Sequence, residues 1–188
     1  RQRFTTARKI VNNMAPRDYD EHKLTIEQLS ERYGVNINGD DIYSSQGLTS
    51  EQASRKNKRK RMKSEVDQLF KVIRDGTEKE VELEDLVPGD LIKVEPGLLH
   101  ADIRLLYVND LLMDTSMLTG ETDLVPRSAQ VSSVSDHSMA ENMIYAGCIA
   151  KSGFAYGVIV ATGVDVFMAT CEDYQVPNQK SSGCCTTM

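Results

Sequence analysis

With 188 residues and a mass of 21.0 kDa, the chain is long enough for one ordinary domain with appended segments. The formal net charge of -6 argues against nucleic-acid binding by the molecule as a whole. The longest charge-free apolar stretch lies between Lys151 and Asp165, is interrupted by glycines, and is shorter than the ~20 residues that a membrane helix needs. These residues are therefore not expected to transport a solute by themselves.

The cysteines give no sign of a metal site. They occur at positions 148, 171, 184 and 185, without the spacing of metal ligands. The amino end shows no secretory leader, which favours a reducing, cytosolic setting. A glycine-rich phosphate-binding loop of the Walker type is also missing from the sequence, so we predict no cofactor or metal site within it.

An amino-terminal helical segment is predicted over residues 1–54. Residues 25–28 carry the Thr-x-x-Gln pattern of a capping box at the start of a helix, and Gly34 supplies the stop. Residues 49–52 repeat the Thr-x-x-Gln pattern and predict the start of a second helix. The segment is therefore expected to hold short helices.

A dense basic run from Arg55 to Lys63 follows, within a predicted linker helix of residues 55–69. The run has almost no apolar face, which is typical of a solvated helical linker. Attraction to an anionic membrane surface and a nuclear import signal are the alternative interpretations.

Alternating hydrophobicity replaces the helical pattern from residue 70 and predicts a mainly β domain over residues 70–171. Asp75-Gly76 predicts the tight turn of a hairpin. The turn residues 87–90 are followed by a predicted strand over residues 91–94. Short strands at this spacing indicate an α+β chain, in which a distorted jelly roll or β-sandwich follows the short helices.

Two further groups of strands complete this predicted domain. Residues 103–108 and 111–113 are expected to form separate strands. After a polar, Ser-rich passage, residues 143–150 and 154–161 are expected to form a second hairpin around Lys151-Ser152-Gly153.

The candidate site lies in the stretch from Leu111 to Pro126. There, Thr119-Gly120-Glu121-Thr122 places one carboxylate beside a glycine, with a hydroxyl on either side. Glycine lets the backbone approach a ligand closely, a carboxylate could accept a proton from water, and hydroxyls could donate to an anion. By spacing alone, a polar turn between two strands is the stronger interpretation, because short motifs often match by chance.

The motifs do not stand alone, since three stretches occur in a fixed order: residues 86–94 (Leu-Val-Pro-Gly-Asp-Leu-Ile-Lys-Val), 101–104 (Ala-Asp-Ile-Arg) and 114–121 (Asp-Thr-Ser-Met-Leu-Thr-Gly-Glu). This series resembles the actuator domain of P-type cation-transporting ATPases, a β-rich fold. In that family a Thr-Gly-Glu-Ser loop swings onto a phosphorylated aspartate in another domain, and its Glu directs the hydrolytic water.

The resemblance implies roles for four residues. Glu121 would be the catalytic carboxylate, and Thr119 and Gly120 match the rest of the signature. Thr122 stands where the family has Ser. Leu124 replaces a proline that is common in the family. This change concerns the geometry of the loop more than the fold.

Residues 20–35 and 46–50 resemble the amino-terminal segment of sodium/potassium and proton/potassium pump catalytic subunits. This narrows the resemblance to one branch of the family. The ion ligands of such pumps would lie on membrane helices that the sequence does not contain.

The resemblance also implies what must lie elsewhere. The family's phosphoryl acceptor, an Asp within Asp-Lys-Thr-Gly, does not occur in the sequence. The expected partners are therefore the phosphorylation and nucleotide-binding domains of a P-type ATPase, with ATP and magnesium required by the complete pump. The site would work at the cytosolic face of a membrane. The alternative is a truncated, non-catalytic regulator that docks on a pump or a membrane.

The tail of residues 172–188 is polar and predicted to be disordered. Its last four residues, Cys185-Thr186-Thr187-Met188, have the frame of a prenylation box, with Cys184 as a second lipid site. A lipid tether at Cys185 is the alternative to a plain disordered tail.

Overall fold

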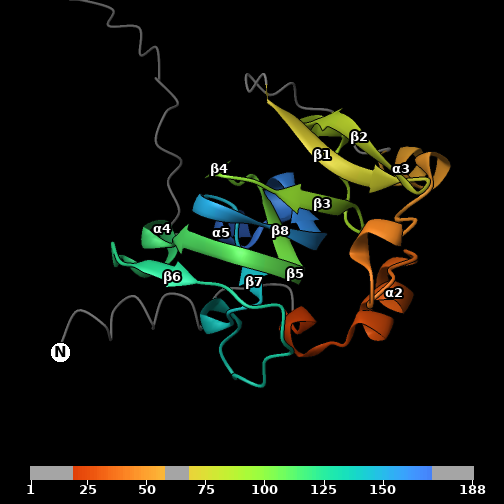
Figure 1. Ribbon diagram of the computed structural model, residues 1–188. Coiled ribbons are helices and arrows are strands. Elements are labelled where there is room, and N and C mark those ends of the chain that lie inside the picture. The colour runs from red at the N-terminus through yellow and green to blue at the C-terminus, as the bar shows by residue number, and fades with distance from the viewer. Residues whose placement is uncertain (1–18, 58–67, 171–188) are drawn as a thin grey trace, which may run out of the picture.

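A computed structural model of the chain describes residues 19–57 and 68–170 (Figure 1). One antiparallel sheet of eight strands has the order β2-β1-β3-β8-β5-β6, with β4 beside β8 and β7 beside β5. The strands are β1 (Leu69–Arg74), β2 (Thr77–Glu82), β3 (Leu91–Val94), β4 (Gly97–Leu98), β5 (Ala101–Asp114), β6 (Leu124–Pro126), β7 (Met143–Ile144) and β8 (Ile149–Thr162). The two longest strands, β5 and β8, pair with each other along their whole length.

The helices of residues 19–57 and 68–170 are all short. The α-helices are α2 (Ile26–Tyr33), α3 (Ser50–Lys56), α4 (Ser116–Thr119) and α5 (Phe167–Thr170), and the 3-10 helices are η1 (Glu21–Lys23), η2 (Ile42–Ser44), η3 (Leu83–Asp85), η4 (His137–Met139) and η5 (Gly163–Asp165). A mainly β fold with short amino-terminal helices is therefore confirmed. No helix among the described residues is long and apolar enough to cross a membrane.

Local sequence signals set the ends of the amino-terminal helices, as predicted. Thr25 caps α2 by accepting a hydrogen bond from the Gln28 backbone, and the Gln28 side chain accepts one in return. Gly34 ends α2 in the left-handed conformation, with a φ of 64°. Thr49 and Gln52 form the second capping box, at the start of α3. Each box satisfies backbone donors that a helix start leaves open.

The predicted Asp-Gly hairpin is also confirmed. Asp75 and Gly76 both have positive φ values, 54° and 71°, as a tight two-residue turn requires. The strands on either side, β1 and β2, then pair in register from Arg74 opposite Thr77 to Leu69 opposite Glu82.

The later strands differ from the prediction. Residues 103–108 and 111–113 belong to one strand, β5, which is irregular around Asp110, where φ is 48°. Lys151-Ser152-Gly153 is not a turn, because β8 runs through it. A Cβ atom on Gly153 would lie 2.3 Å from the Asp110 carbonyl oxygen. The glycine therefore serves the close approach of two strands, which its sequence context does not distinguish from a turn.

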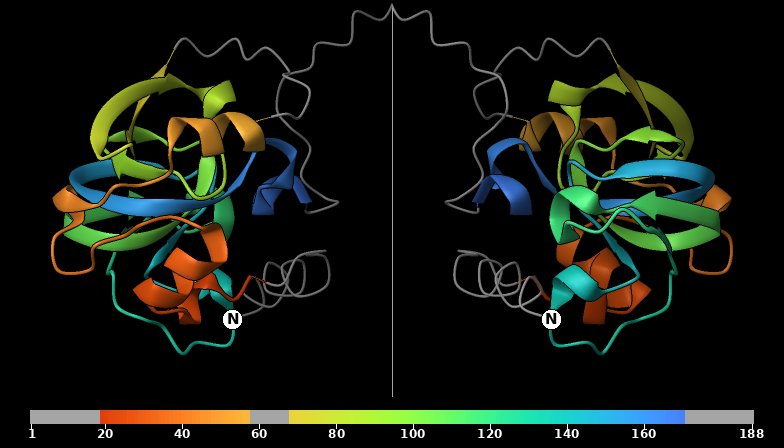
Figure 2. Two further views of the ribbon diagram at one scale, coloured as in Figure 1. Left: turned by 90° about the vertical axis from the view of Figure 1, so that its right-hand side faces the viewer. Right: turned by 90° about the vertical axis from the view of Figure 1, so that its left-hand side faces the viewer.

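The amino-terminal segment shares one hydrophobic core with the sheet. Leu29 and Leu48 from the segment are fully buried in the same cluster as Leu91, Ile103 and Leu105 from the strands. Figure 2 shows α2 and α3 lying against one end of the curved sheet. Residues 19–57 therefore form part of the same packed unit as the strands.

A buried arginine on β5 holds the amino-terminal segment against the sheet. The Arg104 guanidinium, which is 1% exposed, donates to the backbone carbonyls of Glu21, Leu24, Leu105 and Ala129. Burial lowers the pKa of Arg104 to about 10, so it remains charged at neutral pH. These bonds join residues 21–24 of the amino-terminal segment to β5 and to the passage after β6.

Several predictions concern residues that lie mainly outside the ranges that the structure describes. Within the predicted linker helix of residues 55–69, α3 ends at Lys56 and β1 begins at Leu69, while residues 58–67 are not described. The basic run Arg55–Lys63 lies mostly in that gap. The tail, with Cys184 and Cys185, also lies outside the described residues.

Candidate functional site

The candidate site lies at the end of β5, on the opposite side of the sheet from α2 and α3 (Figures 1 and 2). After β5 ends at Asp114, residues 115–123 form the Thr-Gly-Glu loop, which contains α4. The chain then returns as β6, with Leu124 opposite Asp114. The loop thus follows a strand end that is paired with β6 on one side and with β8, at Ile149, on the other.

The backbone of the loop is folded on itself. The carbonyl of Thr115 accepts hydrogen bonds from the amides of Leu118 and Thr119, at 2.8 and 2.9 Å. The amide of Gly120 donates to the carbonyl of Ser116 at 2.8 Å. Gly120 then takes a left-handed conformation, with a φ of 75°, that ends the helix and turns the chain toward Glu121.

Thr119 links the helix to the catalytic candidate. Its hydroxyl donates to the carbonyl of Thr115 at 3.2 Å and accepts a hydrogen bond from the amide of Glu121, also at 3.2 Å. The single hydroxyl proton is therefore used inside the loop. In this arrangement Thr119 holds the backbone of Glu121 and does not offer its proton to an anion.

Glu121 and Thr122 both have exposed side chains. Within the described part of the chain, the Glu121 carboxylate has no hydrogen-bond or ion-pair partner. A Cβ atom on Gly120 would meet no atom within 4 Å, so this part of the loop is open. An exposed carboxylate without a second catalytic group is a poor active site alone, but it is accessible to a reacting group on another domain.

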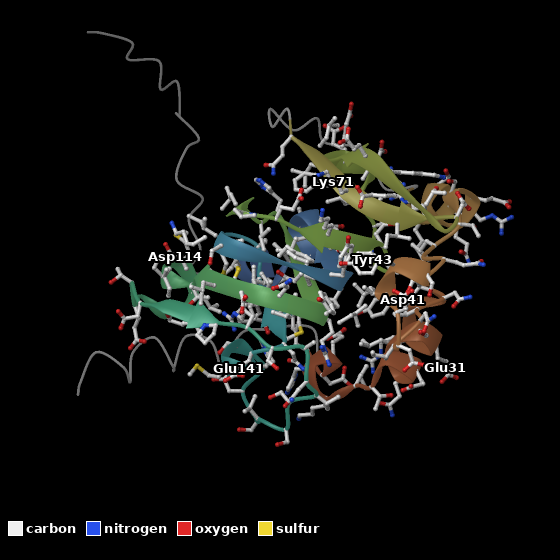
Figure 3. All side chains as sticks on the ribbon, in the orientation of Figure 1. Glu31, Asp41, Tyr43, Lys71, Asp114 and Glu141 are labelled. Atoms are coloured by element: carbon white, nitrogen blue, oxygen red, sulfur yellow. The ribbon has the colours of Figure 1, made fainter. Side chains whose placement is uncertain are left out.

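Asp114 anchors the start of the loop, and Figure 3 labels it beside α4. One carboxylate oxygen accepts the backbone amide of Ser116 at 3.0 Å, and the other lies 3.3 Å from Nζ of Lys151. The hydrogen bonds from Ser116, assisted by Lys151, lower the pKa of Asp114. Sequence reasoning missed Lys151, because it was assigned to a turn.

The other two motifs of the sequence series serve the scaffold. Asp90, from residues 86–94, is fully buried and forms two contacts with the Arg74 guanidinium, at 2.7 and 2.5 Å. Asp102, from residues 101–104, is also buried and accepts hydrogen bonds from the Tyr19 hydroxyl and the Phe167 amide. Of the three motifs, only the Thr-Gly-Glu loop presents its carboxylate to solvent.

No group of three or more His, Cys, Asp or Glu side chains in residues 19–57 and 68–170 is arranged to hold a metal ion. Cys148 is buried, and burial raises the pKa of its thiol to about 11, so it is not a reactive thiolate.

Residues 64–173 match the family described as the P-type ATPase actuator domain. The calcium-transporting ATPase type 2C member 2 of Mus musculus is 35% identical over 118 residues, covering 58% of this chain and 12% of that protein. The plasma membrane calcium-transporting ATPase mca-1 of Caenorhabditis elegans is 38% identical over 104 residues, covering 55% of this chain and 8% of that protein. A calcium-transporting ATPase of Bacillus subtilis is 33% identical over 104 residues, covering 54% and 12%. The chain matches no more than 12% of the length of these three relatives.

Proposed function

The chain belongs to the family of P-type ATPase actuator domains, and on that premise we propose that it is the actuator portion of a P-type cation-transporting ATPase. Its task is to bring Glu121 to an aspartyl phosphate on the phosphorylation domain. The observation that carries this proposal is the exposure of Glu121 on a loop whose hydrogen bonds are made among its own residues and with Asp114, the last residue of β5. Such a carboxylate can meet a partner domain without any rearrangement of the core.

The proposed chemistry is the positioning and activation of water. The Glu121 carboxylate accepts a proton from the water that attacks phosphorus, as a general base within hydrogen-bond reach would do. The bond between phosphorus and the aspartate oxygen breaks as the bond to water forms, which releases phosphate and the free aspartate carboxylate. Gly120 leaves the loop backbone without a side chain at the point of approach, and the Thr122 hydroxyl is exposed for a hydrogen bond to the partner domain. Thr119 holds the Glu121 amide, and so fixes where the carboxylate begins.

The remaining components of the reaction belong to other domains in this proposal. The phosphorylation and nucleotide-binding domains hold the acceptor aspartate, ATP and magnesium, and the actuator domain works at the cytosolic face of the membrane. The site described here has a carboxylate and hydroxyls but no acceptor. Hydrolysis of ATP by this chain alone is therefore not part of the proposal.

We further propose that the parent pump belongs to the sodium/potassium or proton/potassium branch. The support is the sequence of residues 20–35 and 46–50, which precede the part matched by the family. The three relatives described above carry calcium-transporting names, and their similarity covers little more than half of this chain. Phosphoenzyme formation by the complete pump should depend on sodium or protons; a dependence on calcium would overturn the branch assignment.

The test of the main proposal is Glu121→Gln in a complete pump that carries these residues. Phosphoenzyme should still form from ATP but should decay at least tenfold more slowly, because a positioned general base contributes about 10²–10⁴-fold. Radioactive phosphate retained on the protein after an ATP chase measures this decay. Asp123→Asn, at a neighbouring exposed carboxylate, is the matched control and should leave decay unchanged.

Unchanged decay in the Glu121→Gln pump would remove the catalytic role from this loop. It would leave the non-catalytic docking alternative as the better account of the chain.

A further inference from the structure

A β-bulge on β8 lies directly beside the end of β5. Leu112 pairs with Ser152 and the next residue, Met113, pairs with Ala150, so one step along β5 corresponds to two along β8. Lys151 is the additional residue. A bulge bends its strand and redirects the side chain that it adds. The regular pairs that follow the bulge, Met113 with Ala150 and Asp114 with Ile149, fix the position of Lys151 relative to the end of β5.

The Lys151 side chain reaches Asp114, the last residue of β5, which supports the start of the loop. Nζ of Lys151 lies 3.3 Å from one carboxylate oxygen of Asp114, and the other oxygen accepts the Ser116 amide at 3.0 Å. In the described part of the chain, Lys151 is the one cation within ion-pair distance of Asp114. A continuous chain of contacts therefore runs from β8 through Asp114 to the first residue of α4.

We propose that Lys151 is a positioning residue, which acts through Asp114 to hold the Thr-Gly-Glu loop in the orientation that hydrolysis requires. This inference rests on the proposed function of Glu121. The helix α4 has only four residues, from Ser116 to Thr119, and none of them is fully buried. Leu118 of α4 packs against the hydrophobic core. The direction of the helix relative to the sheet therefore depends on this packing, on the contacts at Asp114 and on the pairing of β6.

The exposure of the Lys151–Asp114 pair sets how much its loss should slow phosphoenzyme decay. The side chains of Lys151 and Asp114 are 41% and 20% exposed, so the pair lies near solvent and its attraction is screened. Exposed ion pairs have small effects, of about a few-fold in a rate. We therefore expect Lys151→Met to slow phosphoenzyme decay about threefold to fivefold in the complete pump.

The following variants distinguish a role of Lys151 in positioning the Thr-Gly-Glu loop from a general effect on the stability of the fold. Lys151→Arg keeps the charge and should restore the decay rate, whereas Lys151→Met should not. Raising the concentration of a salt that the pump does not transport should slow decay more in the wild-type pump than in Lys151→Met, because only the wild type has the Lys151–Asp114 pair to screen. Asp114→Asn should slow decay as Lys151→Met does, and the double variant should be no slower than either single variant. The control is Lys93→Met, which removes a lysine of β3 that is paired with Glu95. This change should leave decay unchanged.

A second measurement uses the 188-residue chain itself. Hydrogen exchange at the Ser116 amide should be faster in Lys151→Met than in the wild type, and close to wild type in Lys151→Arg. Equal exchange in all three proteins, or equal decay in the corresponding pumps, would overturn the inference. If Glu121→Gln also has no effect on decay, the proposed function fails; Ser116 exchange then still shows whether Lys151 holds the loop.

Discussion

The amino-terminal segment, residues 19–57, and the Thr-Gly-Glu loop, residues 115–123, are attached to the same sheet in opposite ways. The segment is joined by long-range contacts to buried groups: Arg104 bonds the carbonyls of Glu21 and Leu24, more than 75 residues away in sequence. The loop is held by hydrogen bonds between neighbours, such as those of the Thr119 hydroxyl with Thr115 and Glu121. One region is part of the core, and the other is presented to solvent.

The difference shows how the fold separates stability from contact with a partner. Regions with many buried contacts open only with the whole fold, whereas regions with few can rearrange locally. The amino-terminal segment therefore contributes to the free energy of unfolding. The loop can be changed chemically with little effect on that free energy, which is what the proposed contact of Glu121 with another domain requires. Three substitutions test this comparison.

The largest effect is expected for Arg104→Met. The change removes the buried guanidinium that donates hydrogen bonds to the backbone carbonyls of Glu21, Leu24 and Ala129. A buried carbonyl left unpaired costs about 1–3 kcal/mol. We expect the free energy of unfolding to fall by about 3 kcal/mol. Urea denaturation followed by circular dichroism measures it.

The control for Arg104→Met is Arg55→Met, because the Arg55 side chain is 71% exposed and is expected to matter little. A stability of Arg104→Met equal to or above that of the wild type would contradict the prediction. It would mean that burying the cation costs more than its hydrogen bonds contribute.

A smaller, pH-dependent effect is expected for Asp75→Asn. Hydrogen bonds from Lys79 and Ser50 lower the pKa of Asp75 to about 2, and so tie the start of α3 to the β1–β2 hairpin. A carboxyl whose pKa is lowered on folding stabilises the protein above its unfolded pKa, near 3.8. That contribution is lost as the pH falls through about 2.

Asp75→Asn should therefore be less stable than the wild type at neutral pH, and the difference should shrink as the pH falls from ~4 to ~2. Asparagine tolerates the positive φ at this position, so the turn is kept. Urea midpoints across this pH range provide the measurement. A difference that stays constant with pH would mean that the charge of Asp75 does not contribute.

The smallest effect on stability is expected in the loop, for Thr119→Val. The change removes the hydroxyl that bonds both the Thr115 carbonyl and the Glu121 amide. Global stability should change by less than about 0.5 kcal/mol, because the site is not in the core. Hydrogen exchange at the Glu121 amide should nevertheless become faster, and Thr119→Ser should restore it. A large loss of global stability would show that the loop belongs to the core after all.

The sequence by itself determined the features that depend on near neighbours. Both capping boxes, the Gly34 helix end and the Asp75-Gly76 hairpin formed as predicted, because each is decided by residues within about four positions of one another. The mainly β fold class followed from the alternation of apolar residues. The motif series also pointed correctly to the actuator-domain family.

Tertiary structure decided the features that join distant parts of the chain. Gly153 looks like a turn in sequence, yet it lies inside β8 because its backbone packs against Asp110. The burial of Arg104 and the contact of Lys151 with Asp114 depend on which strands become neighbours. Glycine, lysine and arginine are each compatible with several environments, and only the register between β5 and β8 selects one of them.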